Sequence, residues 1–187
     1  MKRLSLAVLL LTGMVLSTSA QTSMKNEKTV MVGGAAMYPS KNIVENAMNS
    51  ADHTTLVTAV KAAGLVETLQ SKGPFTVFAP TNAAFNLLPA GTVENLVKPE
   101  NKAMLTGILT YHVVTGRLDS KELMKWIKKG NGTAELTTVA GGKLWLMSKD
   151  NELWLKDEKV GMAKVEIKDV YQSNGVIHSI DHVLMPK

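Results

Sequence analysis

Two short apolar segments that lie far apart in the chain constrain its fold more than any other feature. Residues 73–85 read GPFTVFAPTNAAF, and residues 174–186 read NGVIHSIDHVLMP. Each segment holds a run of β-branched or aromatic residues bounded by glycine, proline or asparagine, a pattern that is typical of a strand. The sequence therefore predicts one strand early in the folded region and one at its end.

The chain between these segments changes character at Gly130. Before Gly130, apolar residues recur at helical spacing, and after it they alternate or are β-branched. Predicted helices cover residues 42–47, 52–63, 65–69, 82–88, 93–97, 99–109 and 120–129. Predicted strands cover residues 75–79, 134–140, 143–148, 153–156, 160–171 and 176–185. A mostly helical first half and a strand-rich second half indicate an α+β fold.

Helix-end signals support several of these boundaries. Thr81, Thr92 and Asp119 carry side-chain oxygens that accept hydrogen bonds from the first turn of a helix, so they are predicted N-caps. Gly64 and Gly130 follow helical stretches and are predicted helix ends, because glycine readily adopts the backbone conformation of a C-terminal cap.

The first twenty residues have the pattern of a secretory signal peptide, residues 1–20. Two basic residues precede an apolar run over 4–16, and small residues at 17–20 provide a cleavage site. Residues 21–37 are polar and then glycine-rich, which predicts a flexible lead-in, and the folded domain is predicted over residues 38–187. We therefore expect an exported protein that is secreted, periplasmic or associated with the cell surface.

The composition argues against several other classes of protein. The chain has no cysteine, and no segment after the signal peptide is apolar enough to be a transmembrane segment. The net charge of +5 comes from scattered lysines, and Arg117 is the only arginine beyond the signal peptide. Because no basic stripe interleaves with aromatic residues, no nucleic acid partner is expected. Nothing in the sequence indicates an oligomeric state.

A third motif, Tyr111-His112-Val113-Val114, lies between the two apolar segments. In order and spacing, the three motifs resemble those of the fasciclin (FAS1) domain family over roughly residues 38–187. The resemblance implies a compact β-wedge or sandwich of about seven strands flanked by several short helices. It also implies adhesion or matrix interaction outside the cell rather than catalysis.

The same resemblance implies a binding surface. In the family, the Tyr-His region and an Asp-Ile pair just ahead of the last motif are implicated in cell adhesion. Tyr111 and His112 match the first feature; Asp169 and Val170 match the second, with valine in place of isoleucine. We therefore predict that these four residues bind a cell-surface or matrix protein or polysaccharide. An aspartate can do so by offering its carboxylate to a metal on a receptor.

Each pair also has a structural interpretation, which the sequence leaves open. The polar ends of Tyr111 and His112 can tie the helical region to a strand through hydrogen bonds. Asp169 can be a turn or strand-end residue that accepts hydrogen bonds from nearby backbone amides.

No catalytic or metal-binding constellation is expected. His178 and His182 fall on a predicted strand, where their separation of about 13 Å is too large for them to share one metal. Ser179 and His178 point to opposite faces of that strand, and no G-x-S-x-G elbow surrounds Ser179. We therefore expect a chain that is not an enzyme and that needs no metal and no cofactor.

Trp145 and Trp154 flank a predicted hairpin turn. They fit either a cross-strand pair that packs the hairpin or an exposed patch that binds a ligand. An exposed patch would favour the alternative function, a small-ligand or polysaccharide-binding module of the cell envelope.

Overall fold

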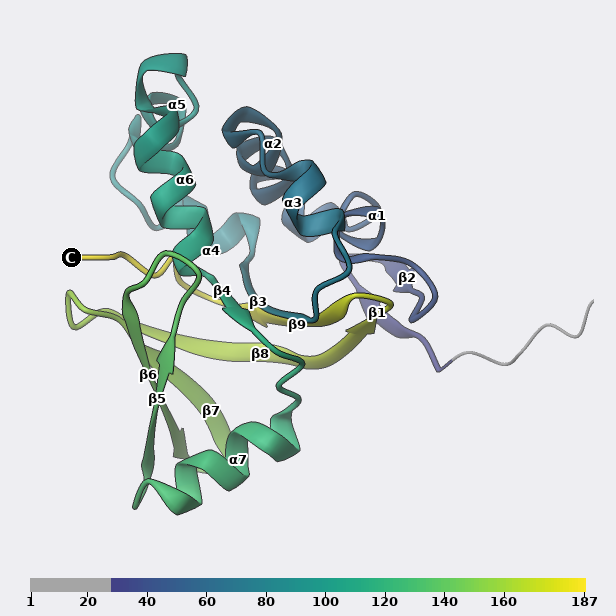
Figure 1. Cartoon of the computed structure of the whole chain (residues 1–187). Coiled ribbons are helices and arrows are strands. Elements are labelled where there is room, and N and C mark those ends of the chain that lie inside the picture. The colour runs from purple at the N-terminus through teal and green to yellow at the C-terminus, as the bar shows by residue number, and fades with distance from the viewer. Residues whose placement is uncertain (1–27) are drawn as a thin grey trace, which may run out of the picture.

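The structure, a computed structural model, describes residues 28–187. The predicted signal peptide and the start of the predicted lead-in lie outside the described residues. Figure 1 shows the α+β arrangement of the described part. Its helices are α1 (Ile43–Ala47), α2 (Thr54–Ala63), α3 (Val66–Gln70), α4 (Asn82–Asn86), α5 (Thr92–Leu96), α6 (Lys102–Tyr111) and α7 (Ser120–Lys129), with 3₁₀ turns η1 (Ala51–His53) and η2 (Pro99–Asn101). Its strands are β1 (Val30–Val32), β2 (Ala35–Met37), β3 (Phe75–Pro80), β4 (Val113–Thr115), β5 (Thr133–Thr137), β6 (Lys143–Lys149), β7 (Glu152–Lys156), β8 (Met162–Gln172) and β9 (Gly175–Ile180).

The two apolar segments of the sequence form neighbouring strands of a seven-stranded sheet, whose order is β4-β3-β9-β8-β7-β6-β5. β3 and β9 run parallel, in register from Phe75 opposite Gly175 to Pro80 opposite Ile180. The other neighbours in this sheet are antiparallel. Every residue of β9 is buried. A strand that is buried on both faces is usually apolar, and Val176, Ile177 and Ile180 fit this rule, whereas the buried His178 and Ser179 make hydrogen bonds.

Strand β8 connects two parts of the sheet. Its first residues pair with β7 and its last residues pair with β9. The register shifts between Val165 and Ile167, and again between Ile167 and Val170. Such irregularities bend a strand and increase its twist. Figure 1 shows β8 as the long strand that reaches from β9 to the β5–β7 group, so its bend separates these two parts of the sheet.

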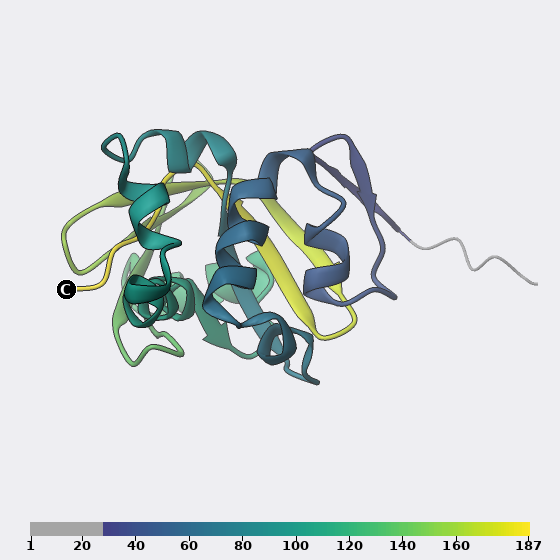
Figure 2. The same cartoon turned by 90° about the horizontal axis from the view of Figure 1, so that it is seen from above.

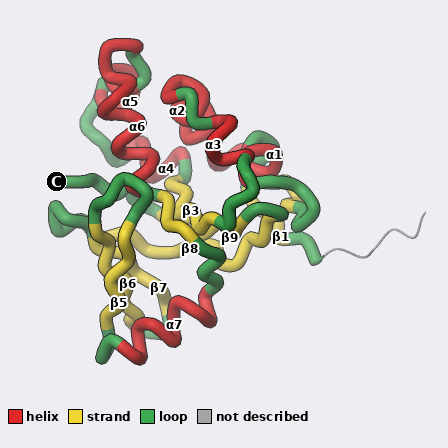
Figure 3. The backbone as a smooth tube through the Cα atoms, in the orientation of Figure 1, coloured by secondary structure: helices red, strands yellow, loops and turns green. Residues whose placement is uncertain are grey.

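Two hydrophobic cores form, one on each side of this division. Figure 3 shows most helices gathered on one side of the strands and α7 at the opposite end. Buried residues of the helix-side core, which lies beneath α1, α2, α3 and α6, include Leu56, Val60, Leu69, Val77 and Ile177. Buried residues of the strand-side core, which lies among β5–β8 and α7, include Leu123, Leu144, Leu146, Leu153 and Leu155.

Residues 30–37 form a hairpin, so the expected flexible lead-in is wrong for this stretch. β1 and β2 pair antiparallel. Gly33 and Gly34 form the turn with φ of 56° and 76°, the left-handed conformation that two-residue hairpin turns favour. Val32 and Met37 are buried in the helix-side core. Their burial orders a segment whose composition alone indicates flexibility. Seen from above in Figure 2, the hairpin lies at the edge of the domain beside the short helices.

Several predicted helix ends are confirmed, and one is not. Thr81 accepts a hydrogen bond from the Ala84 N–H at 3.2 Å, and Gly64 follows α2 with φ of 72°. The prediction for Thr92 is wrong, because Gly91 holds the N-cap position and Thr92 is already the first residue of α5.

The last strand is shorter than the sequence predicts. β9 ends at Ile180 rather than near residue 185. The next residue, Asp181, accepts a hydrogen bond from the Lys164 N–H at 2.7 Å through its side chain, and the chain beyond it leaves the sheet. His182 therefore lies outside β9 and is exposed.

Candidate functional site

Tyr111, the last residue of α6, is fully buried in the strand-side core. Its hydroxyl donates to the Lys143 carbonyl at 2.7 Å and accepts from the Glu158 N–H at 3.1 Å. Gly142 packs directly on the ring, since a Cβ there would lie 2.7 Å from a ring carbon. Burial raises the pKa of Tyr111 to about 12. The side chain therefore ties α6 to β6 and to the loop after β7.

His112 follows Tyr111 but makes contacts of a different kind. Its Nε2 accepts from the Leu184 N–H at 3.0 Å, and its Nδ1 lies 2.8 Å from the Ile108 carbonyl. Because the amide N–H can only donate, the ring proton sits on Nδ1 and is donated to Ile108. Burial lowers the pKa of His112 to about 4, so the ring is neutral at physiological pH. His112 thus fixes the C-terminal segment against α6.

Asp169 occupies the bulge of β8 in a left-handed conformation, with φ of 62°. Its two carboxylate oxygens accept from the Ser120 N–H at 2.6 Å and the Ser120 hydroxyl at 2.5 Å. Its own N–H donates to Nδ1 of His178 at 3.3 Å. Asp169 therefore holds the first residue of α7, and the residue as a whole is only half-buried.

Val170 follows Asp169 directly in β8, but its surroundings are different. It is buried in the helix-side core and pairs with Ile177 of β9. Of the four predicted binding residues, Tyr111, His112 and Val170 are buried, and only Asp169 reaches the surface. The structure does not bring the Tyr-His pair and Asp169 together on one exposed surface.

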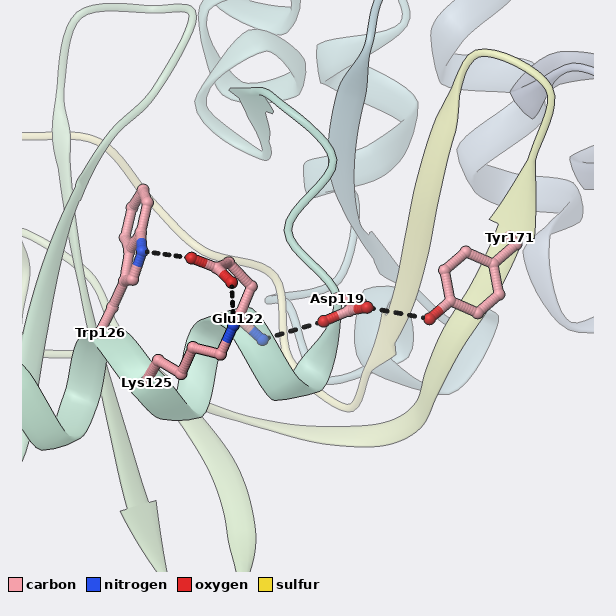
Figure 4. Close-up of polar contacts among 5 residues, drawn as sticks. All are labelled: Asp119, Glu122, Lys125, Trp126 and Tyr171. Carbon is pink, nitrogen blue, oxygen red and sulfur yellow. Dashed lines mark hydrogen bonds and ion pairs between the residues drawn. The ribbon is translucent and has the colours of Figure 1, made fainter.

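The exposed surface next to Asp169 is formed by α7 and the end of β8, and Figure 4 shows five of its side chains. We call Asp119, Glu122, Lys125, Trp126 and Tyr171 the α7 face. Asp119 caps α7 by accepting from the Glu122 N–H at 2.9 Å, and it accepts from the Tyr171 hydroxyl at 3.1 Å. Glu122 pairs with Lys125 at 2.9 Å and accepts from Nε1 of Trp126 at 3.1 Å.

Two aromatic side chains make the α7 face unusual for a helix surface. Trp126 is 38% exposed and Tyr171 is 39% exposed. Each is held by a hydrogen bond to a carboxylate. Rigid, partly exposed aromatic residues beside charged ones are the side chains that protein interfaces favour. Neither Tyr171 nor Trp126 was predicted from the sequence as a binding residue, although Tyr171 follows the predicted Asp-Val pair directly.

The remaining histidines do not converge on a catalytic or metal site. His178 is buried, stacks on Phe78 with ring centroids 5.7 Å apart, and lies 2.9 Å from the Leu118 carbonyl through Nε2. His182 is exposed and contacts Asp181 at 2.8 Å. Within the described residues, no group of three His, Cys, Asp or Glu side chains is arranged to hold a metal ion. His178 is thus the hydrogen-bonded structural residue that its apolar neighbours indicate.

Three buried polar side chains that the sequence did not predict are joined by hydrogen bonds. Ser50, His53 and Ser179 are all buried. The Ser50 hydroxyl lies 2.9 Å from Nδ1 of His53, and the Ser179 hydroxyl lies 3.1 Å from Nε2. His53 and Ser179 are 126 residues apart, so no local sequence pattern predicts that they pair. Burial lowers the pKa of His53, against the opposing effects of the Ala79 carbonyl and Asp52.

The last motif also organises the helices through Asn174. Its side-chain oxygen accepts from the Ile43 N–H at 3.0 Å, and its amide donates to the carbonyls of Leu69 and Ser71, each at 2.8 Å. Gly175 follows because a Cβ there would lie 2.2 Å from the Phe75 carbonyl oxygen. The Asn-Gly pair therefore joins α1, α3 and the β3–β9 ladder, and its role is structural.

Trp145 and Trp154 lie on the outer face of β6 and β7, opposite the buried leucines of these strands. Trp145 pairs with Lys156 and Trp154 pairs with Met147, which makes the two rings diagonal neighbours. Both side chains are half-buried. The two tryptophans therefore pack across the strands and are also partly exposed. They are neither a fully buried packing pair nor a fully exposed patch.

Comparison with known proteins identifies the family. Residues 51–186 match the Fasciclin domain family. Protein sll1483 of Synechocystis sp. is 46% identical over 179 residues, which cover 94% of this chain and 92% of that protein. The cell surface glycolipoprotein MPB83 of Mycobacterium bovis is 34% identical over 160 residues, which cover 83% of this chain and 64% of that protein. The chain therefore belongs to the fasciclin (FAS1) domain family.

The solved structures agree on the fold. A FAS1 domain pair from the insect cell adhesion molecule Fasciclin I superposes with a TM-score of 0.71 at 18% identity. The match covers 79% of this chain and 52% of the insect chain. At this identity the likeness establishes the fold alone. Across residues 28–187, none of the helices combines the length and the apolar character needed to span a bilayer.

Proposed function

We propose that this chain is an exported, non-catalytic adhesion module that binds a cell-surface or matrix partner through Asp169 and the α7 face. Membership of the fasciclin family supports this class of function, and the surface location in the name of the mycobacterial relative supports an extracellular or cell-surface location. Because one fold can host many functions, the proposal depends on the site itself.

The observation that carries the proposal is the half-buried Asp169, which holds the first residue of α7, together with the partly exposed aromatic rings of Tyr171 and Trp126 on the α7 face. Each carboxylate oxygen has two acceptor positions, and Ser120 occupies one on each. The remaining positions can accept a hydrogen bond or coordinate a metal held by the partner. In this proposal Tyr111, His112 and Val170 act from the interior, by fixing α6, the C-terminal segment and β8.

A matched pair of substitutions tests the site. Asp169→Asn removes the charge but keeps a residue that tolerates a left-handed backbone. Asp150→Asn is the control, because Asp150 is exposed and also left-handed, with φ of 52°, in the β6–β7 turn. Binding of the exported protein to intact cells, matrix proteins and polysaccharides would be measured, with circular dichroism to verify folding.

We expect saturable binding that falls at least tenfold in Asp169→Asn and is unchanged in Asp150→Asn. Equal binding by the two variants would move the site away from Asp169 and keep adhesion as the function. A native protein that binds no cell, matrix protein or polysaccharide would contradict the proposed function itself.

A second candidate is polysaccharide binding on the outer face of β6 and β7. The diagonal pair of half-buried rings, Trp145 and Trp154, favours it, since flat aromatic faces suit sugar rings. Trp145→Ala and Trp154→Ala would each abolish polysaccharide binding and leave protein partners unaffected. Retention of polysaccharide binding in both variants would remove this candidate.

A further inference from the structure

A groove of about 350 Å³ runs along α7 where this helix borders β7 and β8. α7 packs mainly against β5 and β6, at the end of the molecule that Figure 1 shows opposite the other helices. The α7 residues that line the groove are Ser120, Lys121, Met124, Lys125 and Lys128, and the strands and the β6–β7 turn contribute Asn151, Leu153 and Lys168. We call this set the lysine groove.

The lysine groove is lined by four lysines and by no carboxylate of the described residues. Lys121, Lys125 and Lys128 recur at helical spacing, which places them on one face of α7, and Lys168 comes from β8. All four are exposed. Lys125 pairs with Glu122 at 2.9 Å, and the other three enter no ion pair with the described part of the chain. The groove therefore carries an excess of positive charge.

The carboxylates around the lysine groove do not neutralise this charge. Asp169 accepts two hydrogen bonds from Ser120, and Glu152 pairs with Lys164 at 2.6 Å. Glu166 lines the adjoining groove on β7 and β8 instead. A concave surface that is lined by charges of one sign concentrates ions of the opposite sign. The lysine groove is therefore suited to an anion that the chain itself does not supply.

The use of lysine without arginine indicates what kind of anion this is. An ammonium group is a point charge on a flexible stem and does not impose the planar, two-point geometry of a guanidinium group. Lys121 and Lys128 are seven residues apart on α7, which is about 10 Å along the helix axis. Charges spread over this length match a linear polymer with repeated anionic groups better than one small ion.

The rest of the lining favours a sugar polymer. Met124 is half-buried and Leu153 is buried, so both offer apolar contact to the C–H faces of sugar rings without protruding into a bilayer. Asn151 is exposed, and its amide can donate to one sugar hydroxyl and accept from another. No aromatic residue of the described chain lines the groove, so it lacks the stacking platform that single-stranded nucleic acids use.

We propose that the lysine groove binds an acidic polysaccharide, a linear sugar polymer with repeated carboxylate groups that pair with Lys121, Lys128 and Lys168. Lysine already pairs with carboxylates on this surface, as in Lys125 with Glu122. The site is separate from the proposed adhesion surface, because Lys125 is the only residue that the α7 face shares with it and Asp169 does not line it.

The test uses polygalacturonate, a carboxylated polysaccharide, with dextran as the neutral sugar. Polyphosphate is the polyanion without sugars, and vesicles of phosphatidylcholine and phosphatidylglycerol are the anionic membrane. Binding of each to the exported protein would be measured by isothermal titration calorimetry at two salt concentrations.

Matched double variants locate the site. Lys128→Gln with Lys168→Gln removes one charge from α7 and one from β8. Lys72→Gln with Lys98→Gln is the control, because it removes two charges from exposed lysines that follow α3 and α5 and lie outside the lysine groove. Circular dichroism verifies folding of both variants.

We expect saturable binding of polygalacturonate that weakens as salt is added, and no binding of dextran. The groove variant should weaken polygalacturonate binding about tenfold and reduce its dependence on salt, whereas the control variant should change binding by less than about twofold. No binding of polygalacturonate, or an equal loss in the two double variants, would overturn the proposal. Polyphosphate or vesicles that bind as tightly as polygalacturonate would also overturn it, because the groove would then recognise charge without a sugar chain.

Single variants separate this site from the other two surfaces. Trp145→Ala and Asp169→Asn leave the groove lysines in place, so neither should weaken polygalacturonate binding. Binding that survives in the groove variant and is lost in Trp145→Ala would place the polysaccharide on the outer face of β6 and β7 and overturn the assignment. Loss of cell binding in Asp169→Asn with polygalacturonate binding intact would support two independent sites.

Discussion

The helix-side and strand-side cores differ in how their burial is achieved. The strand-side core is built from alternating strands, and Leu144, Leu146 and Leu155 are completely buried. The helix-side core is built from several helices of five residues, contains an apolar cavity of about 70 Å³, and includes the buried polar residue His53 in the wall of that cavity. Long strands with a fixed alternation fill space regularly, whereas the cavity lies where several short helices meet the sheet.

The neighbours Tyr111 and His112 show this division within one motif. Tyr111 enters the strand-side core and bridges β6 to the loop after β7. His112 lines the helix-side cavity and bridges α6 to the C-terminal segment. One dipeptide therefore connects the dense core to the loosely packed one, which gives the Tyr-His motif a structural purpose whether or not it also serves adhesion.

The largest expected effect comes from a matched pair of leucines. Leu146→Ala in the strand-side core should lower the free energy of unfolding by about 4 kcal/mol, because its tightly packed surroundings cannot collapse. Leu56→Ala, beside the cavity on α2, should cost about 2 to 3 kcal/mol, because the neighbouring five-residue helices α1 and α3 can shift inward. Urea denaturation measures both. Equal costs would contradict the difference in packing between the two cores.

The next largest effect is a pH dependence centred on His112. The fold lowers its pKa from 6.5 to about 4, so the unfolded chain binds more protons between these values. The free energy of unfolding should therefore be constant with respect to this group above pH 6.5. It should fall as the pH is lowered, by about 3 kcal/mol at pH 4.

His112→Gln isolates this contribution. The variant should be less stable than the native protein at pH 7, because it loses the hydrogen bonds to Ile108 and Leu184. Its stability should also depend less steeply on pH between 6.5 and 4. Buried His53 and His178 also have lowered pKa values, so some slope should remain. An unchanged slope in His112→Gln would show that His112 is not the dominant titrating group.

The strand-side core and its motifs were more predictable than the helix-side core. Alternation of leucines with polar residues predicts β5, β6 and β7, and turn glycines bound them. The parallel pairing of β3 with β9 was not predicted, because strand pairing across 100 residues leaves no local signal. The approximate positions of the helices were also predicted, as were the caps at Thr81 and Asp119.

The parts of the site that escaped prediction are those that depend on long-range burial. The sequence marks Asp169 but not its bonds to Ser120, and it does not single out His53, whose partner Ser179 is distant in the chain. The hairpin of residues 30–37 was missed because its order comes from packing onto the helix-side core. The composition of a segment describes that segment in isolation, whereas its burial depends on the residues that it packs against in the fold.

Tyr111→Phe should have a smaller effect, confined to the strand-side core. It removes the hydroxyl that pairs with the Lys143 carbonyl and the Glu158 N–H. The ring packing on Gly142 remains, so the free energy of unfolding should fall by about 1 to 2 kcal/mol. Hydrogen exchange should accelerate at Glu158 while amides of α2 stay protected. Faster exchange spread evenly over both cores would contradict this division.

The smallest expected effect compares the caps of one helix from each core. Asp119→Ala removes the cap of α7, and Asn42→Ala removes the cap of α1, where Asn42 accepts from the Glu45 N–H at 2.9 Å. Each should cost about 1 kcal/mol in thermal or urea unfolding. Asp119→Ala should cost slightly more, because it also leaves the Tyr171 hydroxyl without its partner.

The contributions of the two caps to stability differ in their dependence on pH. The hydrogen bond from the Glu122 N–H holds the pKa of Asp119 below its usual value of 3.8. Its contribution is therefore present above that value and is lost as the pH falls through the lowered pKa. The Asn42 side chain does not titrate, so the cost of Asn42→Ala should not follow this pattern. If the stability difference between native protein and Asp119→Ala stayed constant down to pH 2, the carboxylate would not be acting as a charged cap.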